Sequence, residues 1–187
     1  MPPKVKITPE MVIEAGFEIV REMGIESLNA RNIAKRLNCS TQPVLYSFRT
    51  IEEIKRAVYE RVDLFHTEYL MNISDDDIML EIGLNYIRFA INEPNLFRFL
   101  FQSGYAKEHS LLEMIDSDEL KPVIAAMEQA METTEEKTKE IFLTIALFAH
   151  GYASIIANNS LEFDEKLAAR HLINAYRGAV LAAKEEE

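Results

Sequence analysis

Residues 30–51 read ARNIAKRLNCSTQPVLYSFRTI, and this stretch decides the fold of the N-terminal part of the chain. The apolar stripe of a first short helix is formed by Ile33, Ala34 and Leu37. Asn38 then ends that helix, because asparagine tolerates the left-handed conformation. Ser40 suits the cap of a second helix, and Pro43 fits its first turn, where a missing N–H costs nothing. A helix, a tight turn and a second helix are typical of a helix-turn-helix.

The second helix of such a motif enters the major groove of DNA. Gln42 near its start suits a bidentate contact to adenine, and Thr41 suits packing of its methyl group against thymine. Residues 30–58 carry six basic side chains against two acidic ones, namely Arg31, Lys35, Arg36, Arg49, Lys55 and Arg56 against Glu52 and Glu53. A basic patch on an acidic chain favours DNA binding. The alternative interpretation is a helical hairpin of an ordinary all-α domain, with the basic residues facing solvent.

The composition favours an all-α protein with a sizeable core. Of the 187 residues, 48% are apolar, and only six are glycine and six proline. Alternating strand-like patterns are absent. One cysteine allows no intrachain disulfide, and the N-terminal residues contain no apolar run of the kind that marks a signal peptide. We therefore expect a cytoplasmic protein in a reducing compartment.

The charge is distributed unevenly along the chain, whose net charge is −11. Residues 1–58 carry nine Lys and Arg against seven Asp and Glu, whereas residues 59–187 carry 11 against 24. This asymmetry predicts an N-terminal DNA-binding domain over residues 1–58 and an acidic C-terminal domain over residues 59–187. An acidic body repels DNA except at the basic face, which orients docking.

Helix boundaries upstream complete a three-helix unit. Thr8-Pro9-Glu10 is a helix start with a capping hydroxyl, a proline at the first helical position and a favourable acid. Gly24 ends this helix, and Asn29 caps the next one. Three helices within about fifty residues suffice to bury the core of a helix-turn-helix.

The run from Ile7 to Val62 resembles the DNA-binding domain of the tetracycline-repressor (TetR) family of transcriptional regulators. The residues that match in order and spacing are Gly24, Ile33-Ala34, Ser40 to Pro43, Phe48 and Glu52-Glu53-Ile54. The resemblance implies an all-α fold of about nine helices, in which a three-helix helix-turn-helix domain precedes a helical ligand-binding and dimerisation domain. A long helix over residues 52–71 joins the two.

The resemblance and the patch together predict a set of DNA-contacting residues: Asn29, Arg31, Ser40, Thr41, Gln42, Pro43, Leu45, Tyr46, Arg49 and Lys55. Two departures from the family pattern leave alternatives open. The usual tyrosine three residues before Phe48 is replaced by Leu45, with Tyr46 next to it, so either residue is a candidate for its phosphate contact. The usual lysine before the Glu-Glu pair is replaced by Ile51, and Lys55 is the candidate for that contact.

The C-terminal half predicts a dimer interface and a small-molecule site. Residues 141–157 form the most apolar stretch, too short for a membrane span, and a helix apolar on all sides is expected to be buried, here against another subunit. Residues 148–160 resemble the next-to-last helix of the family's dimerisation domain. By periodicity and aromaticity, the candidates for the ligand site are Tyr86, Phe89, Phe101, Met127, Phe148 and Tyr152.

Signatures of catalysis are lacking. The four histidines stand in no Glu-x-x-His or His-x-x-x-His spacing, so we expect no metal site, no cofactor and no enzyme. Cys39 reads as a core residue rather than a redox sensor, and His150 as a core or interface residue rather than a ligand contact. The function predicted is a homodimeric, inducer-responsive repressor on a pseudo-palindromic DNA operator. The alternative is a helical protein that binds or sequesters small molecules without a role at DNA.

Overall fold

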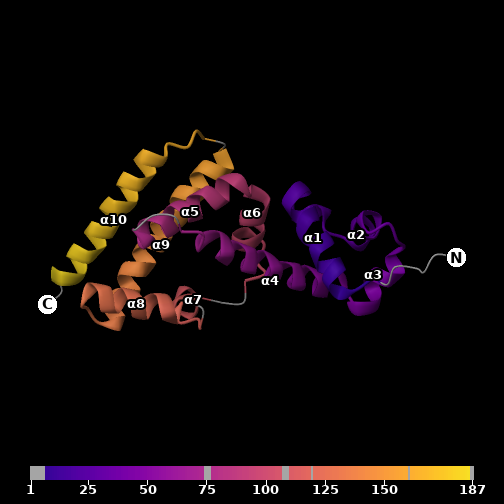
Figure 1. Cartoon of the computed structure of the whole chain (residues 1–187), viewed down its shortest axis with the longest axis horizontal. Coiled ribbons are helices and arrows are strands. Elements are labelled where there is room, and N and C mark those ends of the chain that lie inside the picture. Colours follow the sequence, from indigo (N-terminus) through magenta and orange to yellow (C-terminus); the bar gives the residue numbers. More distant parts are fainter. Residues whose placement is uncertain (1–6, 74–76, 107–109, 119, 160, 186–187) are drawn as a thin grey trace. The chain divides into compact units, whose positions relative to one another are not determined.

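The computed structural model describes residues 7–73, 77–106, 110–118, 120–159 and 161–185. Over these residues it contains ten α-helices and one short 3-10 helix, with no strand (Figure 1). The all-α prediction is confirmed, and the short helix α7 (Leu111–Ile115) accounts for the difference from the nine helices expected. The chain divides into two compact units, and each is treated by itself. The predicted domain boundary after residue 58 stays a prediction.

The N-terminal unit comprises residues up to Tyr69 together with Asn92–Ala106. Its helices are α1 (Pro9–Met23), η1 (Ile25–Ser27), α2 (Ala30–Arg36), α3 (Thr41–Ser47), α4 (Ile51–Leu70) and α6 (Pro94–Gln102). Side chains from α1, α2, α3, α4 and α6 fill one core, in which the largest fully buried members include Phe17, Ile33, Val44, Ile54 and Phe99. The first three α-helices, α1 to α3, which we call the head, therefore share their core with α4 and α6.

Local signals set α1 as predicted. The Thr8 hydroxyl accepts a hydrogen bond from the Met11 amide at 3.3 Å, and Pro9 occupies the first helical position. Gly24 ends the helix with a φ of 79°, a conformation that favours glycine. Gly16 allows close packing, since a Cβ there would lie 2.6 Å from Cγ2 of Val58 on α4.

Helix α6 packs against α1 and α4. The Arg21 guanidinium of α1 pairs with the Glu93 carboxylate just before α6, with Nε 2.9 Å from Oε2. The Tyr59 hydroxyl of α4 donates to the Leu100 carbonyl at 3.3 Å, and its ring meets Phe99 edge-on. These contacts fix α6 to both helices.

The C-terminal unit comprises Leu70–Ile91 and the described residues after Ala106. Its helices are α5 (Ile78–Asn92), α7, α8 (Lys121–Met131), α9 (Glu135–Asn159) and α10 (Glu165–Glu185), and α9 and α10 run side by side (Figure 1). The buried Asn85 side chain donates to the carbonyls of Leu70 and Asn72, at 3.2 and 3.0 Å. Arg88 in turn donates to Asn85 Oδ1 at 2.8 Å and pairs with Glu81 and Glu165.

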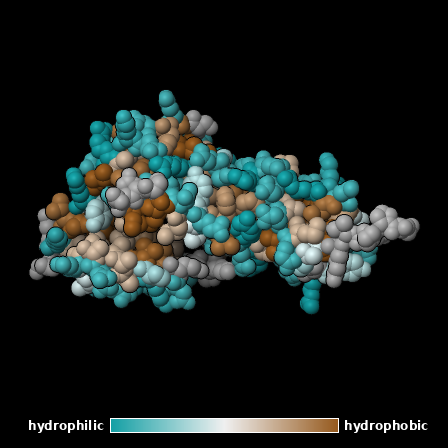
Figure 2. All heavy atoms as spheres, viewed as in Figure 1, coloured by the Kyte–Doolittle hydropathy of each residue, from teal (hydrophilic) through white to brown (hydrophobic). Residues whose placement is uncertain are grey.

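Helix α9 is longer and less buried than its sequence pattern predicted. It starts at Glu135, and its exposed apolar side chains include Leu147, Phe148 and Ile155, which are 47%, 37% and 58% exposed. Apolar residues also gather on the surface of this unit in Figure 2. Within one chain α9 is thus not buried on all sides, and its burial by a second subunit stays a prediction. Among the described helices, α9 alone is long and apolar enough to cross a membrane. A single helix of this kind is weak evidence for a membrane span.

Candidate nucleic-acid interface

The turn between α2 and α3 is a Schellman motif. Asn38 adopts a φ of 51°, in the left-handed region. The backbone amide of Asn38 donates a hydrogen bond to the Lys35 carbonyl at 3.2 Å, and the backbone amide of Cys39 donates to the Ala34 carbonyl at 2.9 Å. The left-handed ending predicted from Asn38 is confirmed. Cys39 is half-buried at this turn, and its predicted structural role is untested.

The start of α2 is held by Asn29, whose Oδ1 accepts from the Asn32 amide at 3.0 Å. The Asn29 amide group also donates to the Ser27 carbonyl at 3.2 Å. The predicted capping role is confirmed. One N–H and one lone pair of this amide remain for the predicted contact with DNA.

Helix α3 buries one side and exposes the other. Val44 is fully buried and anchors the helix on the head. The polar residues at its start, Ser40, Thr41 and Gln42, are exposed, and Ser40 precedes the helix without making a capping hydrogen bond. Pro43 is half-buried in the first turn. The exposed side of α3 therefore offers several polar side chains to solvent.

The structure separates the two candidates for the missing tyrosine. Tyr46 is 78% exposed, whereas Leu45 is 42% exposed. The amide nitrogen of Gln42 lies 3.4 Å from the Tyr46 hydroxyl, so these two side chains share one side of α3. Tyr46 is thus the better placed of the two for a polar contact.

A variant of the capping box starts α4, in which the Glu53 side chain reaches back to the residue before the N-cap. The Thr50 hydroxyl accepts from the Glu53 amide at 3.2 Å, and the Arg49 amide donates to the Glu53 carboxylate at 2.8 Å. Glu53 therefore fixes the backbone at Arg49 and leaves the Arg49 side chain exposed. Sequence reasoning missed this role of Glu53, although Thr-x-x-Glu is a recognisable signal in the sequence.

The six predicted basic residues divide into paired and unpaired groups. Arg36 makes a bidentate pair with Glu22 of α1, at 2.8 and 2.7 Å. Lys55 lies 3.0 Å from Glu52, and this hydrogen bond raises the pKa of Lys55. The other four, Arg31, Lys35, Arg49 and Arg56, are exposed and pair with no acidic side chain among the described residues. Arg31 and Lys35 precede α3 in the sequence, and Arg49 and Arg56 follow it.

The six predicted ligand-site residues are dispersed. Phe101 lies in the N-terminal unit, 5.5 Å from the ring of His66 between centroids, and Phe89 is fully buried. Met127 belongs to an apolar cluster with Ile141 and Ala183. The remaining three are Tyr86, Phe148 and Tyr152, all in the C-terminal unit. Their grouping as one ligand site stays a prediction.

The Tyr86 hydroxyl and the His150 ring form a part-buried polar contact. Their atoms Oη and Nδ1 are 2.8 Å apart, and burial raises the pKa of Tyr86. Burial also lowers the pKa of His150, which favours the neutral form of the ring. Ser154 lies 3.3 Å from its Nε2. His150 therefore has partners inside the protein.

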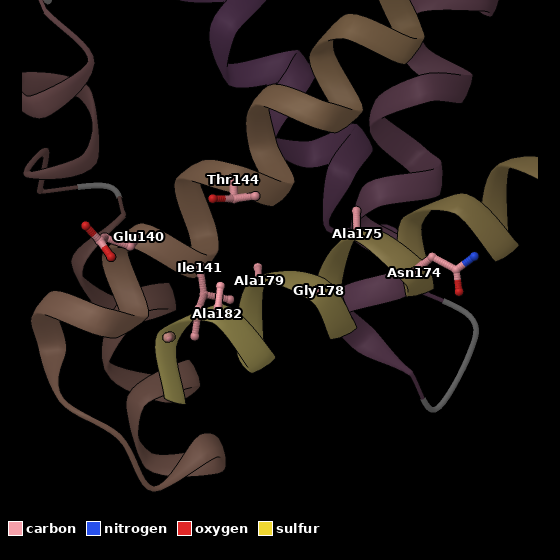
Figure 3. A pocket seen from close by; sticks show the side chains of 9 residues that line it. Glu140, Ile141, Thr144, Asn174, Ala175, Gly178, Ala179 and Ala182 are labelled. Carbon is pink, nitrogen blue, oxygen red and sulfur yellow. The ribbon is translucent and has the colours of Figure 1, made fainter. Parts of the chain in front are cut away.

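An open groove of about 380 Å³ lies between α9 and α10 (Figure 3). It is lined by Glu140, Ile141, Thr144, Asn174, Ala175, Gly178, Ala179, Ala182 and Ala183. None of the six predicted ligand-site residues is in this lining. Within the described residues, no three or more His, Cys, Asp or Glu side chains gather as a metal site.

Comparisons with known proteins agree with this architecture. No family model matches the chain. An uncharacterised HTH-type transcriptional regulator, YobS of Bacillus subtilis, is 23% identical over 173 residues, which span 89% of this chain and 88% of that protein.

Two solved structures show the same fold. A TetR-like transcriptional regulator from Rhodococcus superposes with a TM-score of 0.62 at 17% identity, over 95% of this chain and 97% of that one. A TetR-family member from Streptomyces coelicolor gives a TM-score of 0.58 at 14% identity, over 89% of this chain and 96% of that one. The protein therefore has the fold of the TetR-like transcriptional regulators, as its sequence resemblance predicted.

Proposed function

We propose that this protein is a DNA-binding transcriptional regulator that acts in the cytoplasm as a homodimer on a pseudo-palindromic operator. The observation that carries the proposal is the exposed side of α3, where Gln42 and Tyr46 share one side of the helix. Polar side chains on an exposed recognition helix suit hydrogen bonds to base edges, and unpaired arginine and lysine suit phosphates. A helix of this kind fits the major groove.

The uncovered apolar surface of α9 supports the homodimer. Leu147 and Ile155 are 47% and 58% exposed in the single chain, and the groove beside α10 is lined largely by small residues. A second copy of the same helices would cover this surface. Two heads would then meet successive major-groove faces about 34 Å apart.

We further propose that a small molecule bound in the C-terminal unit releases the DNA and so relieves repression. A ligand lowers DNA affinity only if it binds the DNA-incompetent arrangement of the dimer more tightly. The candidates for its site are the predicted residues of that unit, namely Tyr86, Phe89, Met127, Phe148 and Tyr152. The acidic body favours a cationic or neutral lipophilic compound over an anion.

The test is binding to DNA from upstream of the protein's own gene, against a scrambled sequence, across a salt series. We expect selective binding by a dimer, with log affinity falling linearly as log salt rises. Arg49→Ala should flatten that slope by about 0.9 per head, because one phosphate contact is lost. Lys121→Ala on α8 is the matched control and should leave the slope unchanged. Absence of binding to any DNA at low salt would reject the regulator and favour a sequestering protein.

A further inference from the structure

Three side chains of the N-terminal unit form a cluster at the start of α4. The Tyr105 hydroxyl donates to Oε2 of Glu52 at 2.6 Å. The Lys55 ammonium donates to Oε1 of the same carboxylate at 3.0 Å. Glu52 is therefore held through both of its oxygens, although its side chain is 57% exposed, and the Lys55 ammonium faces this carboxylate. The Lys55 side chain is 24% exposed.

Tyr105 comes from a distant part of the chain. It follows α6, after Gly104 with a φ of 74°, and its ring packs on Phe99 with centroids 5.8 Å apart. It stands at the end of the N-terminal unit, because the chain passes into the C-terminal unit after Ala106.

We propose that Glu52 is an internal substitute for a DNA phosphate, and that Tyr105 holds it on Lys55 so that this lysine binds DNA only when the contact opens. The proposal rests on the DNA-binding function inferred above. Lys55 is one turn from the capping box that fixes Arg49, so its ammonium belongs to the same end of α4 as that exposed cation. We call the cluster of Glu52, Lys55 and Tyr105 the α4 clamp.

The electrostatics of the α4 clamp predict that opening it strengthens DNA binding. A carboxylate paired with an ammonium contributes no net charge to the surface, so the clamp adds nothing to the attraction of phosphates. Removing the negative charge leaves Lys55 with no partner in the cluster except the phenol. A phosphate is then the strongest acceptor within its reach.

The first experiment compares four forms of the full-length protein: the natural sequence, Glu52→Gln, Lys55→Ala and the double variant. Glu52→Gln should tighten DNA binding by about three- to tenfold near physiological salt and steepen the salt slope by about 0.9 per head. Lys55→Ala should weaken DNA binding less in the natural sequence than in the Glu52→Gln background, because the clamp already neutralises the lysine. In the double variant the gain should disappear. Unchanged or weaker binding by Glu52→Gln would overturn the proposal.

The second experiment isolates Tyr105. Tyr105→Phe keeps the ring on Phe99 and removes only the hydroxyl, so it should tighten DNA binding in the same direction as Glu52→Gln but by less. Tyr59→Phe is the matched control, since it also removes a hydroxyl that joins α4 to the end of α6 but does not touch Glu52. If Tyr105→Phe bound DNA like the natural protein, Tyr105 would have no part in the clamp.

The third experiment needs no DNA. The rate at which an amine-reactive acylating reagent labels Lys55 is measured by mass spectrometry, with the exposed Lys35 as internal reference. Glu52→Gln and Tyr105→Phe should raise the Lys55 rate relative to Lys35 by about two- to fivefold. Equal ratios in all forms would reject the clamp, even if the protein binds DNA. Accelerated labelling in a protein that binds no DNA would retain the clamp and reject the regulatory function.

Discussion

The Gln42 amide nitrogen lies 3.4 Å from the Tyr46 hydroxyl, one turn further along α3. This contact makes the two longest exposed polar side chains of the helix neighbours. An amide that already has a neighbour on its own helix loses less conformational freedom on binding than a freely rotating one. The pair therefore favours Gln42 as the residue that reads a base.

Gln42→Ala should relax base specificity at one position of each half-site. We expect a loss of discrimination of about 1–3 kcal/mol there, because one bidentate contact is removed. The measurement is the affinity for the operator and for single-base variants of it. Tyr46→Phe leaves the Gln42 side-chain amide in place and should preserve most of the discrimination between bases. Full discrimination by Gln42→Ala would mean that another residue reads that base.

Gly16→Ala should destabilise the N-terminal unit. The added Cβ would lie 2.6 Å from Val58 Cγ2, on a fully buried side chain, so α1 and α4 must move apart. Overpacking of this kind costs about 1–3 kcal/mol. Urea unfolding would measure it, and the cost should be smaller in a Val58→Ala background. Equal costs in both backgrounds would show that Val58 is not the obstacle.

Gly178→Leu should weaken self-association if the groove between α9 and α10 lies in the dimer interface. A side chain at Gly178 meets no atom within 4 Å in the single chain, although the residue lines the groove between α9 and α10. Glycine in a helix is unfavourable by roughly 0.5–1 kcal/mol relative to alanine, so the substitution should not harm the isolated fold. Sedimentation should nevertheless show weaker self-association, because the leucine fills space meant for a partner. Unchanged association would place the dimer interface elsewhere.

The stability of the N-terminal unit should fall as the pH is lowered. Burial lowers the pKa of His66 from 6.5 to about 4, so below pH 6.5 the unfolded chain binds a proton that the folded chain does not. The free energy of unfolding should therefore decrease between about pH 6.5 and about pH 4, by on the order of 3 kcal/mol at most. Comparison with His66→Gln isolates this contribution. Identical pH profiles for the two proteins would contradict it.

Much of the fold could be predicted from the sequence, because interactions between residues close in the chain determine where its helices start and end. Thr8 and Asn29 cap their helices as predicted, and Asn38 takes the left-handed turn that its side chain tolerates. Each of these effects acts within about five residues, so the sequence alone carries them. Ser40 shows the limit, since it stands before α3 yet makes no capping hydrogen bond.

The arrangement of the candidate site was less predictable. The contact between Tyr105 and Glu52 joins residues 53 positions apart, and no periodicity signals it. Which basic residues are free depends in the same way on tertiary packing, as the pairing of Arg36 with Glu22 shows. Helix α9 is apolar on several sides, so its pattern was unable to indicate which side the chain leaves uncovered.

The pair of Arg36 and Glu22 also bears on how the proposed regulator would find its operator. A genome offers about 10⁶–10⁹ non-cognate sites, and every free cation strengthens binding to all of them alike. Neutralising Arg36 within the head weakens that indiscriminate attraction and leaves the exposed side of α3 intact. A larger share of the protein would then stay off non-cognate DNA and remain available to bind its operator.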